Sequence, residues 1–274
     1  MIPQIIHCVW LSGDTKPQIY ADCIQSWHLT MPEFEIKEWS INNLPENVLN
    51  CPFVSGAMKA KKWAYATDYI RLWALHTYGG IYMDMDVMVF KSFTPFINHR
   101  FFSSIELDPR YLYNSISNKK RKEIIGLGIE AAVMGAEKEH PFIKDALDLY
   151  KHLKFINTPE FCFEHIMPRM LTRTAKSLYG FKLIPNYQIL RDDMHLYPCD
   201  VFSSVYDWHT IGYDSFDEAL VNLKSNPIRY SCHLCAHAWY EGTVNYHTFK
   251  WKIKHFIYVI TLAKYWKKKR KVII

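Results

Sequence analysis

In Ile81-Tyr82-Met83-Asp84-Met85-Asp86-Val87-Met88-Val89-Phe90, two aspartates interrupt an otherwise apolar run. Most of its residues are β-branched, aromatic or methionine, and Gly79-Gly80 just before it supplies a turn, as is typical of a buried strand. Residues two apart on a strand point to the same face, so we expect Asp84 and Asp86 to lie side by side. The stretch therefore predicts a buried strand that carries a pair of carboxylates.

Two neighbouring carboxylates in a buried strand favour a metal site. They repel each other and lose hydration, so both stay ionised only when a cation or several donors lie between them. Oxygen ligands favour hard ions such as Mg²⁺ or Mn²⁺, which keep open positions for substrate phosphates. The pattern predicts an enzyme that handles a metal-bound diphosphate. An alternative stays open, in which one aspartate ends the strand and the other caps a turn.

Length and composition are those of a globular protein. The 274 residues suffice for one large α/β domain, or a domain with an insert, with an ample core. Residues 1–7 lack a basic leader and a cleavage site of small residues, and the seven cysteines lack a framework spacing. We therefore expect reduced thiols and a cytoplasmic location.

The net charge of +6 is concentrated near the C-terminus. The last eleven residues contain six basic side chains, namely Lys264, Lys267, Lys268, Lys269, Arg270 and Lys271. The rest of the chain is close to neutral. This distribution argues against a nucleic-acid-binding face on the body and favours a tail that meets an anionic surface.

The C-terminal segment is aromatic as well as basic. Its apolar part, residues 256–263, is far shorter than the roughly 20 residues that span a bilayer. An interfacial helix, peripheral on the inner face of a membrane, is one interpretation, and a core helix with a solvated basic end is the other. We predict a catalytic domain over residues 1–245 and a helical tail over residues 246–274.

The predicted elements alternate as in an α/β protein. Strands are expected at residues 2–10, 34–39, 81–90, 100–106, 129–136, 181–184, 195–197 and 228–233, helices at 20–29, 56–78, 141–153 and 161–177, and a loop at 108–122. The opening elements are typical of a nucleotide-binding layer. The sequence lacks both the Gly-x-Gly-x-x-Gly fingerprint and the Gly-Lys-Ser/Thr phosphate loop, so it supports neither a dinucleotide site nor a P-loop.

The helix expected at residues 56–78 carries a charged pair. Asp68 and Arg71 are three residues apart and are therefore neighbours on the helix surface, able to pair or to receive a ligand together. As an exposed salt bridge they would contribute only about 0.3–0.5 kcal/mol. Because this helix leads through Gly79-Gly80 into the Asp84 strand, the pair belongs to the same local unit as the two acids.

Several motifs, taken in chain order, resemble those of family 32 glycosyltransferases, the family with a DXD sugar-binding region. They are Ile6-His7-x-x-Trp10, Ser26-Trp27, Ala66-Thr67-Asp68-x-x-Arg71, Tyr78-Gly79-Gly80-Ile81-Tyr82-x-Asp84-x-Asp86, His140-Pro141, and His233 followed six positions later by Trp239. The family includes initiating α-1,6-mannosyltransferases of fungi and many bacterial capsule and lipopolysaccharide transferases. The core motif is also similar to that of the large glucosylating bacterial toxins.

The resemblance implies a fold and a reaction. The fold is α/β of GT-A type, with a mixed, mainly parallel central sheet flanked by helices. The reaction is the transfer of a hexosyl group, with retention, from a UDP- or GDP-sugar to a glycan or lipid-linked glycan acceptor in surface polysaccharide synthesis. A divalent cation, Mn²⁺ or Mg²⁺, would be required.

The resemblance also implies residue roles. Trp10 would stack on the donor base, and stacking on an indole suits any planar base. Asp68 and Arg71 would hold the sugar hydroxyls. Asp84 would lie near the ribose and the metal, and Asp86 would bind the metal directly.

The family's closing His-to-Trp motif is present with departures. His233 would lie near the metal and the diphosphate, and Trp239 beside the phosphates. Ala238 stands where the family usually has serine, and His237 is a second imidazole that could take the place of His233. A zinc site at Cys232-x-x-Cys235 is disfavoured, because the second half of a four-cysteine pattern is missing.

Glu130 is the one acid in the apolar strand expected at residues 129–136. It could face the anomeric carbon or the acceptor. A role in binding donor or acceptor hydroxyls is favoured over a role as a covalent nucleophile.

Two other functions compete with a transferase. Residues 83–87 fit the Asp-x-Asp-x-Val motif of haloacid-dehalogenase phosphohydrolases, but that family carries it on the first strand, and two strands and two helices are expected earlier here. The other alternative is a non-catalytic sugar-binding protein that keeps the pocket.

Overall fold

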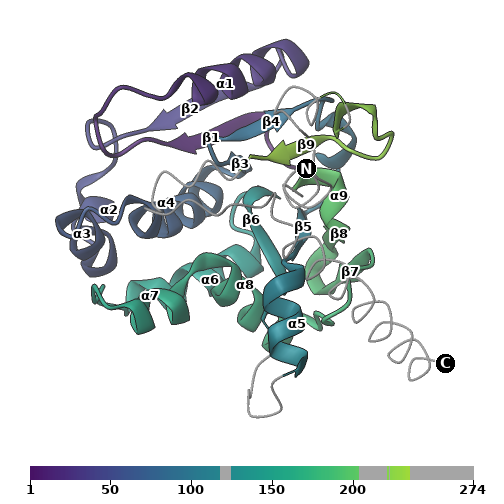
Figure 1. Cartoon of the computed structure of the whole chain (residues 1–274). Coiled ribbons are helices and arrows are strands. Elements are labelled where there is room, and N and C mark those ends of the chain that lie inside the picture. The colour runs from purple at the N-terminus through teal and green to yellow at the C-terminus, as the bar shows by residue number, and fades with distance from the viewer. Residues whose placement is uncertain (118–124, 204–220, 222, 235–274) are drawn as a thin grey trace, which may run out of the picture.

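The computed structural model describes residues 1–117, 125–203, 221 and 223–234. Within these residues a seven-stranded sheet lies between helices (Figure 1). Its strands, in spatial order, are β2 (Glu35–Trp39), β1 (Ile5–Val9), β3 (Gly80–Met83), β6 (Leu127–Ala136), β5 (Phe101–Leu107), β8 (Met194–Tyr197) and β7 (Gln188–Leu190).

Five of the seven strands run in the same direction. Strand β1 is parallel to both β2 and β3, and β5 is parallel to β8. Strand β6 is antiparallel to β3 and β5, and β7 is antiparallel to β8. The predicted α/β fold class, with a mixed, mainly parallel central sheet flanked by helices, is therefore confirmed.

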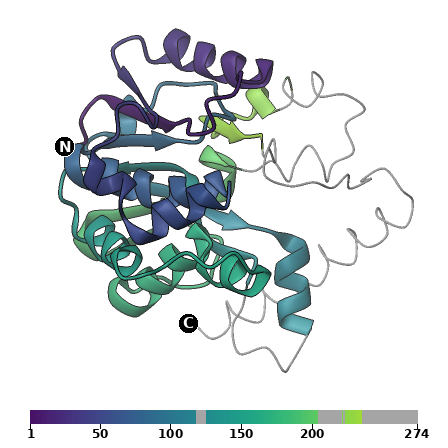
Figure 2. The ribbon, with the colours of Figure 1, turned by 90° about the vertical axis from the view of Figure 1, so that its left-hand side faces the viewer.

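Helices cover both faces of this sheet (Figures 1 and 2). Four of them share an apolar core with one face, namely α3 (Pro52–Lys59), α4 (Trp63–Tyr78), α6 (Pro141–Lys151) and α8 (Met167–Thr174). On the other face the core includes residues of α1 (Gln18–Thr30) and α9 (Cys199–Phe202). The other helical segments are α2 (Glu46–Leu49), α5 (Pro109–Ser117), α7 (Pro159–His165), and the short η1 (Thr94–Phe96), η2 (Ala175–Tyr179) and η3 (Arg191–Asp193).

A second, two-stranded sheet lies beside the first. It pairs β4 (Val87–Val89) antiparallel with β9 (Ser231–His233), so that Val87 stands opposite His233. The strand predicted at residues 228–233 is thus present in shortened form. The pairing brings a distant part of the chain next to the Asp-x-Asp motif.

Two glycines make the sharp connection from α4 to β3. Gly79 and Gly80 have φ of 66° and 108°, in the region that disfavours side chains. A Cβ on Gly80 would lie 2.6 Å from the carbonyl oxygen of Ile5, and a Cβ on Gly79 would lie 2.6 Å from the backbone nitrogen of Lys138. Only glycine therefore allows α4 to lead directly into the centre of the sheet.

The strand predicted over residues 81–90 is wrong in one respect. The chain leaves β3 after Met83, turns through Asp84-Met85-Asp86, and enters β4 at Val87. The two acids therefore lie in a turn between two sheets and not along one strand. The apolar run is still buried, because each half enters a separate strand.

Two predicted helices are each divided. The helix at residues 56–78 is broken at Lys61, whose φ of 54° is left-handed, so α3 and α4 are separate. The helix at 161–177 is broken at Ile166, because Pro168 lies in the first turn of α8 and a proline cannot continue a helix from its interior.

Two further predictions of local structure are wrong. The loop expected at residues 108–122 begins as helix α5, and its remainder lies outside the described residues. No strand forms at residues 181–184 of the described chain. The edge of the sheet is instead β7, at residues 188–190.

No described helix has the length and apolar character needed to cross a membrane. The tail predicted at residues 246–274 lies outside the described residues.

Candidate active site

The Asp-x-Asp turn is held by backbone hydrogen bonds on both sides. The N–H of Asp84 donates to the carbonyl oxygen of Ala132 on β6 (2.9 Å), and the N–H of Val87 donates to the carbonyl oxygen of Asp84 (3.0 Å). The N–H of Leu234, just past β9, donates to the carbonyl oxygen of Asp86 (2.9 Å). The backbone that carries both carboxylates is therefore fixed where β3, β6 and β9 meet.

Helix α1 anchors the strand that follows this turn. The indole N–H of Trp27 donates to the carbonyl oxygen of Val87 (2.7 Å), and the hydroxyl of Ser26 accepts from the N–H of Val89 (3.0 Å). Trp27 is fully buried. The Ser26-Trp27 pair in the sequence therefore positions β4 and does not line the site itself.

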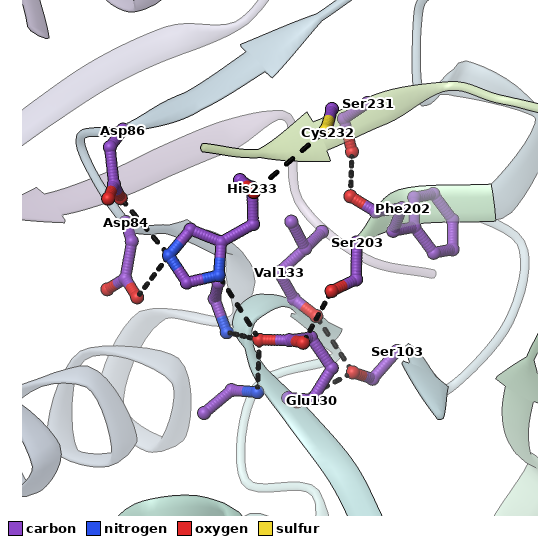
Figure 3. A network of polar contacts seen from close by, with 12 residues as sticks. Asp84, Asp86, Ser103, Glu130, Val133, Phe202, Ser203, Ser231, Cys232 and His233 are labelled. Carbon is purple, nitrogen blue, oxygen red and sulfur yellow. Dashed lines mark hydrogen bonds and ion pairs between the residues drawn. The ribbon is translucent and has the colours of Figure 1, made fainter. Parts of the chain in front are cut away.

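Three potential metal-ligand atoms, one each from Asp84, Asp86 and His233, lie within 4.8 Å of one another (Figure 3). Nε2 of His233 lies 3.3 Å from Oδ1 of Asp86 and 4.0 Å from Oδ2 of Asp84. Ligand atoms at about 2.1 Å from a common ion are separated by distances of this size. Two carboxylates and one imidazole therefore fit a divalent ion such as Mn²⁺.

The other ring nitrogen of His233 faces an acid. Nδ1 lies 3.7 Å from Oε1 of Glu130 (Figure 3). A metal-binding histidine commonly directs its second N–H toward a carboxylate, which fixes the tautomer and the ring orientation. Glu130 is placed to do this for His233.

Asp84 is also held by side chains from β3 and α4. The hydroxyl of Tyr82 donates to its Oδ1 (2.6 Å), and Nη2 of Arg71 lies 3.4 Å from the same oxygen. The guanidinium of Arg71 stacks over the ring of Tyr82, 4.5 Å from its centroid. The acid, the phenol and the guanidinium thus form one cluster at the end of β3.

Asp68 and Arg71 form a buried pair and not the weak surface pair considered from the sequence. Their side chains are 7% and 6% exposed, and Nη2 of Arg71 lies 3.2 Å from Oδ1 of Asp68. Burial raises the pKa of Asp68 to about 7, although the positive charge of Arg71 opposes this shift. Nη1 of Arg71 donates to the carbonyl oxygen of Ala131 (2.7 Å), which ties the pair to β6.

Trp10 lines the same cavity from the end of β1. Its indole N–H donates to the carbonyl oxygen of Asp14 (2.9 Å), and its ring packs edge-on against Tyr20 of α1, with centroids 5.5 Å apart. Burial raises the pKa of Tyr20 to about 12, and the charges of Asp86 and Asp84 add to the shift. The two aromatic residues therefore form the wall of the cavity nearest to α1.

Glu130 on β6 is held by three donors. Its Oε1 accepts from the N–H groups of Ala131 (3.1 Å) and Ala132 (3.0 Å), and its Oε2 accepts from the hydroxyl of Ser203 (2.5 Å) (Figure 3). Its carboxylate therefore has one fixed orientation, facing His233.

One cavity of about 340 Å³ is lined by the side chains that the sequence predicted for the site and the structure describes, namely Trp10, Asp68, Arg71, Asp84, Asp86, Glu130 and His233. Sequence reasoning assigned no role to several residues of its wall, among them Tyr20, Tyr82, Glu106 and Ser203. Tyr82 lies within the quoted Asp-x-Asp motif, so its position in the sequence could have identified it as a residue of the site. The other three come from separate elements, and no local pattern in the sequence marks them.

Four residues of the closing His-to-Trp segment belong to the part of the chain that the structure does not describe. Trp239, together with Cys235, His237 and Ala238, lies outside the described residues.

Cys232 is buried in an apolar cluster with Cys23, Leu223 and Leu234. The described cysteines, which are six of the seven, form no disulfide with one another. The structure thus brings Trp10, Asp68, Arg71, Asp84, Asp86, Glu130 and His233 together, and their individual roles stay predictions.

A second group of ligand atoms lies at the opposite edge of the sheet, in His99, Asp193 and His195. The imidazoles of His99 and His195 stack with centroids 3.6 Å apart, so their in-plane lone pairs do not converge on one point. His195 bonds to Asp193 (2.8 Å), and His99 bonds to Tyr197 (2.9 Å). We interpret this group as a hydrogen-bonded network that joins β5 to β8.

Comparison with known proteins identifies the region around the Asp-x-Asp turn. The family described as "Glycosyltransferase sugar-binding region containing DXD motif" matches residues 17–103. The chain is 24% identical over 169 residues to inositol phosphoceramide mannosyltransferase 3 of Schizosaccharomyces pombe, a match that covers 61% of this chain and 40% of the relative. It is 30% identical over 107 residues to an uncharacterized glycosyltransferase of Acanthamoeba polyphaga mimivirus, covering 37% of this chain and 42% of the relative. The chain thus spans less than half the length of these two curated relatives.

Solved structures with a similar arrangement include the galactosyltransferase LgtC in complex with donor and acceptor sugar analogs. The similarity has a TM-score of 0.41 with 13% sequence identity, and it covers 85% of this chain and 88% of LgtC. The matched residues 17–103 include Asp68, Arg71, Asp84 and Asp86. This region of the chain is thus similar to the family of glycosyltransferases with a DXD-containing sugar-binding region.

Proposed function

We propose that this protein is a metal-dependent retaining glycosyltransferase. It moves a hexosyl group from a nucleoside-diphosphate sugar to a hydroxyl group of a glycan. The observation that carries the proposal is the convergence of Asp84, Asp86 and His233 in a cavity that also contains an exposed indole face and a buried Asp-Arg pair. Each of these three features suits one part of a nucleotide sugar.

The donor has a base, a diphosphate and a sugar, and the cavity offers a place for each. Trp10 is partly exposed and lies beside Tyr20, which suits stacking on a planar base. Asp68 and Arg71 lie on the α4 side of the cavity, where a carboxylate and a guanidinium suit sugar hydroxyls. The acids of the Asp-x-Asp turn lie between β3 and β4, where the ion that they would hold suits the diphosphate.

Asp84, Asp86 and His233 would hold the divalent ion. Bound there, Mn²⁺ or Mg²⁺ supplies positive charge where the leaving diphosphate becomes more negative. Arg71 contributes a permanent positive charge on the same side, because Asp84, Tyr82 and Asp68 raise its pKa further even though burial alone would lower it. The chain therefore needs no separate acid to protonate the leaving group.

In transfer with retention, the acceptor hydroxyl attacks from the side on which the diphosphate leaves. A bond forms between the acceptor oxygen and the anomeric carbon, the bond from that carbon to the phosphate oxygen breaks, and the hydroxyl proton passes to the leaving phosphate. Glu130 binds sugar hydroxyls and orients His233 in this scheme. Its three donors and fixed orientation suit positioning better than nucleophilic attack.

The family resemblance and the basic tail support a proposal for the acceptor and for the location. We propose a glycan or lipid-linked glycan used in surface polysaccharide synthesis, with the protein in the cytoplasm at the inner face of a membrane. The six basic residues between positions 264 and 271 support this location. Flotation with anionic vesicles checks it: deletion of residues 264–274 should abolish binding, and equal binding of both forms would contradict it.

Incubation of the full chain with UDP- and GDP-hexoses and Mn²⁺ tests the activity. Slow hydrolysis of one donor in water, abolished by EDTA, is the expected result. Phosphate release from simple monoesters would instead indicate a phosphohydrolase. Donor binding without turnover would indicate a sugar-binding protein, and either result would contradict the proposal.

A further inference from the structure

Glu106 is an acid in the cavity with no role in the reaction described so far. It is the second-to-last residue of β5, is partly buried, and lines the cavity together with Glu130. It stands opposite Gly128 on β6, and a Cβ on that glycine would lie 3.6 Å from Oε2 of Glu106. Glu106 therefore lies over a position without a side chain, at the edge of the cavity.

The Glu106 carboxyl differs from its neighbour in having no partner within the part of the chain that the structure describes. Glu130 accepts three hydrogen bonds, whereas the described residues offer the side chain of Glu106 neither a hydrogen bond nor an ion pair. Burial raises the pKa of Glu106 to about 8, and the charges of Glu130 and Asp108 add to the shift. An acid without a partner in a cavity is costly for the fold, which is typical of a group kept for a ligand.

The order of the strands places Glu106 away from the donor. Trp10 follows β1, Asp84 follows β3, Glu130 is on β6 and Glu106 is on β5, and these four strands are consecutive neighbours in the sheet. Neighbouring strands are about 4.8 Å apart, so Glu106 lies about 10 Å beyond the Asp84 strand. A donor that extends from Trp10 to the Asp-x-Asp turn leaves this part of the cavity open.

The wall beside Glu106 is apolar. Leu107 follows Glu106 on β5, and Pro168 lies close by, since Oε2 of Glu106 and the carbonyl oxygen of Pro168 would each lie 3.6 Å from a Cβ on Gly128. A sugar ring presents C–H groups on its faces and hydroxyl groups around its rim, so an apolar wall with one unpartnered carboxyl matches it. The combination suits a second sugar, which is the acceptor.

We propose that Glu106 binds a hydroxyl group of the acceptor sugar and so positions the acceptor beside the donor. This inference rests on the function proposed above and adds one acceptor-binding residue to it. The Glu106 carboxyl forms a hydrogen bond with an acceptor hydroxyl other than the one that reacts. Loss of the bond should weaken acceptor binding more than donor binding.

Steady-state kinetics of Glu106→Ala and Glu106→Gln test the proposal. The donors are UDP- and GDP-hexoses with Mn²⁺, and the acceptors are p-nitrophenyl hexosides. In Glu106→Ala the acceptor KM should rise about tenfold or more, while the donor KM stays within about twofold. Glu106→Gln keeps hydrogen-bonding capacity and should recover part of the loss.

Glu35→Ala is the matched control, because Glu35 is an exposed glutamate on β2, at the far side of the sheet. It should leave both KM values unchanged. An unchanged acceptor KM in Glu106→Ala, or equal rises in the acceptor and donor KM values, would overturn the inference. A wild-type protein that turns over no nucleotide sugar would overturn the proposed function itself, and this is seen before any variant is compared.

Discussion

At the scale of single residues, the site depends on charged side chains that the fold places close to one another. Asp84 and Asp86 face His233 across distances of 3.3–4.0 Å, and Arg71 approaches Asp84 from the opposite side. Such an arrangement is stable only when the negative charges are compensated. Arg71 compensates one side, and a divalent ion is the natural counter-charge on the other.

Replacing Asp86 with asparagine tests this compensation. Asp86→Asn keeps the shape of the side chain but removes one metal-binding charge, so donor turnover with Mn²⁺ should fall at least about a hundredfold. The melting temperature should change little. Asp22→Asn, at an exposed position on α1, is the control and should keep full activity. Full turnover in Asp86→Asn would rule out the metal role.

Trp10 gives a separate test of donor binding. Stacking of a base on an aromatic ring contributes about 1–3 kcal/mol, so Trp10→Ala should raise the donor KM about tenfold or more. Trp10→Phe keeps an aromatic face and should recover most of the affinity. If the donor KM is the same in all three proteins, Trp10 only packs against Tyr20 and does not bind the base.

At the scale of elements, the sequence predicted those strands and helices that a local pattern of apolar residues specifies. Strands β1, β2, β5, β6 and β8 and helices α1 and α6 lie close to their predicted positions. The breaks in the two divided helices were missed because each depends on one residue. These residues are Lys61, which has a left-handed backbone conformation, and Pro168 in the first turn of α8. The end of β3 after Met83 was missed because β4 pairs with β9, a segment far away in the chain.

The junction between α4 and β3 is the element on which the site depends most. Gly80→Ala should lower the free energy of unfolding by about 2 kcal/mol or more, because it combines a disfavoured positive φ with a Cβ 2.6 Å from the carbonyl oxygen of Ile5. Gly180→Ala is the control. It has a similar φ of 83° but open space around the Cβ, so it should cost only about 1 kcal/mol. Chemical denaturation measures both, and equal losses would contradict the close-approach argument.

At the scale of the whole molecule, the sheet order assembles a site that no local pattern contains. The acids of the Asp-x-Asp motif, Asp68, Arg71 and Trp10 were recognised from the sequence, because they belong to motifs with fixed spacing. Ser203 and Glu106 were not, because they reach the cavity only through the packing of α9 and the position of β5 beside β6. Strand order is a property of the folded molecule, so these residues became visible only in the structure.

Glu106 also predicts how stability depends on pH. Its pKa rises from 4.5 to about 8 on folding, so the folded state disfavours the charged form. The unfolded chain releases this proton near pH 4.5, and stability is therefore lost as the pH rises from about 4.5 to 8. In EDTA, the stability of Glu106→Gln relative to wild type should increase between pH 4 and pH 8. A difference that does not depend on pH would contradict the buried, unpartnered state of Glu106.

Binding of UDP and GDP, measured by calorimetry with and without Mn²⁺, tests the central claim most directly. If Asp84, Asp86 and His233 hold an ion that grips the donor diphosphate, Mn²⁺ should tighten binding of one nucleotide at least about tenfold in the wild type. The same ion should have no such effect in Asp86→Asn. Equal nucleotide affinity of the wild type with Mn²⁺ and with EDTA would contradict the account.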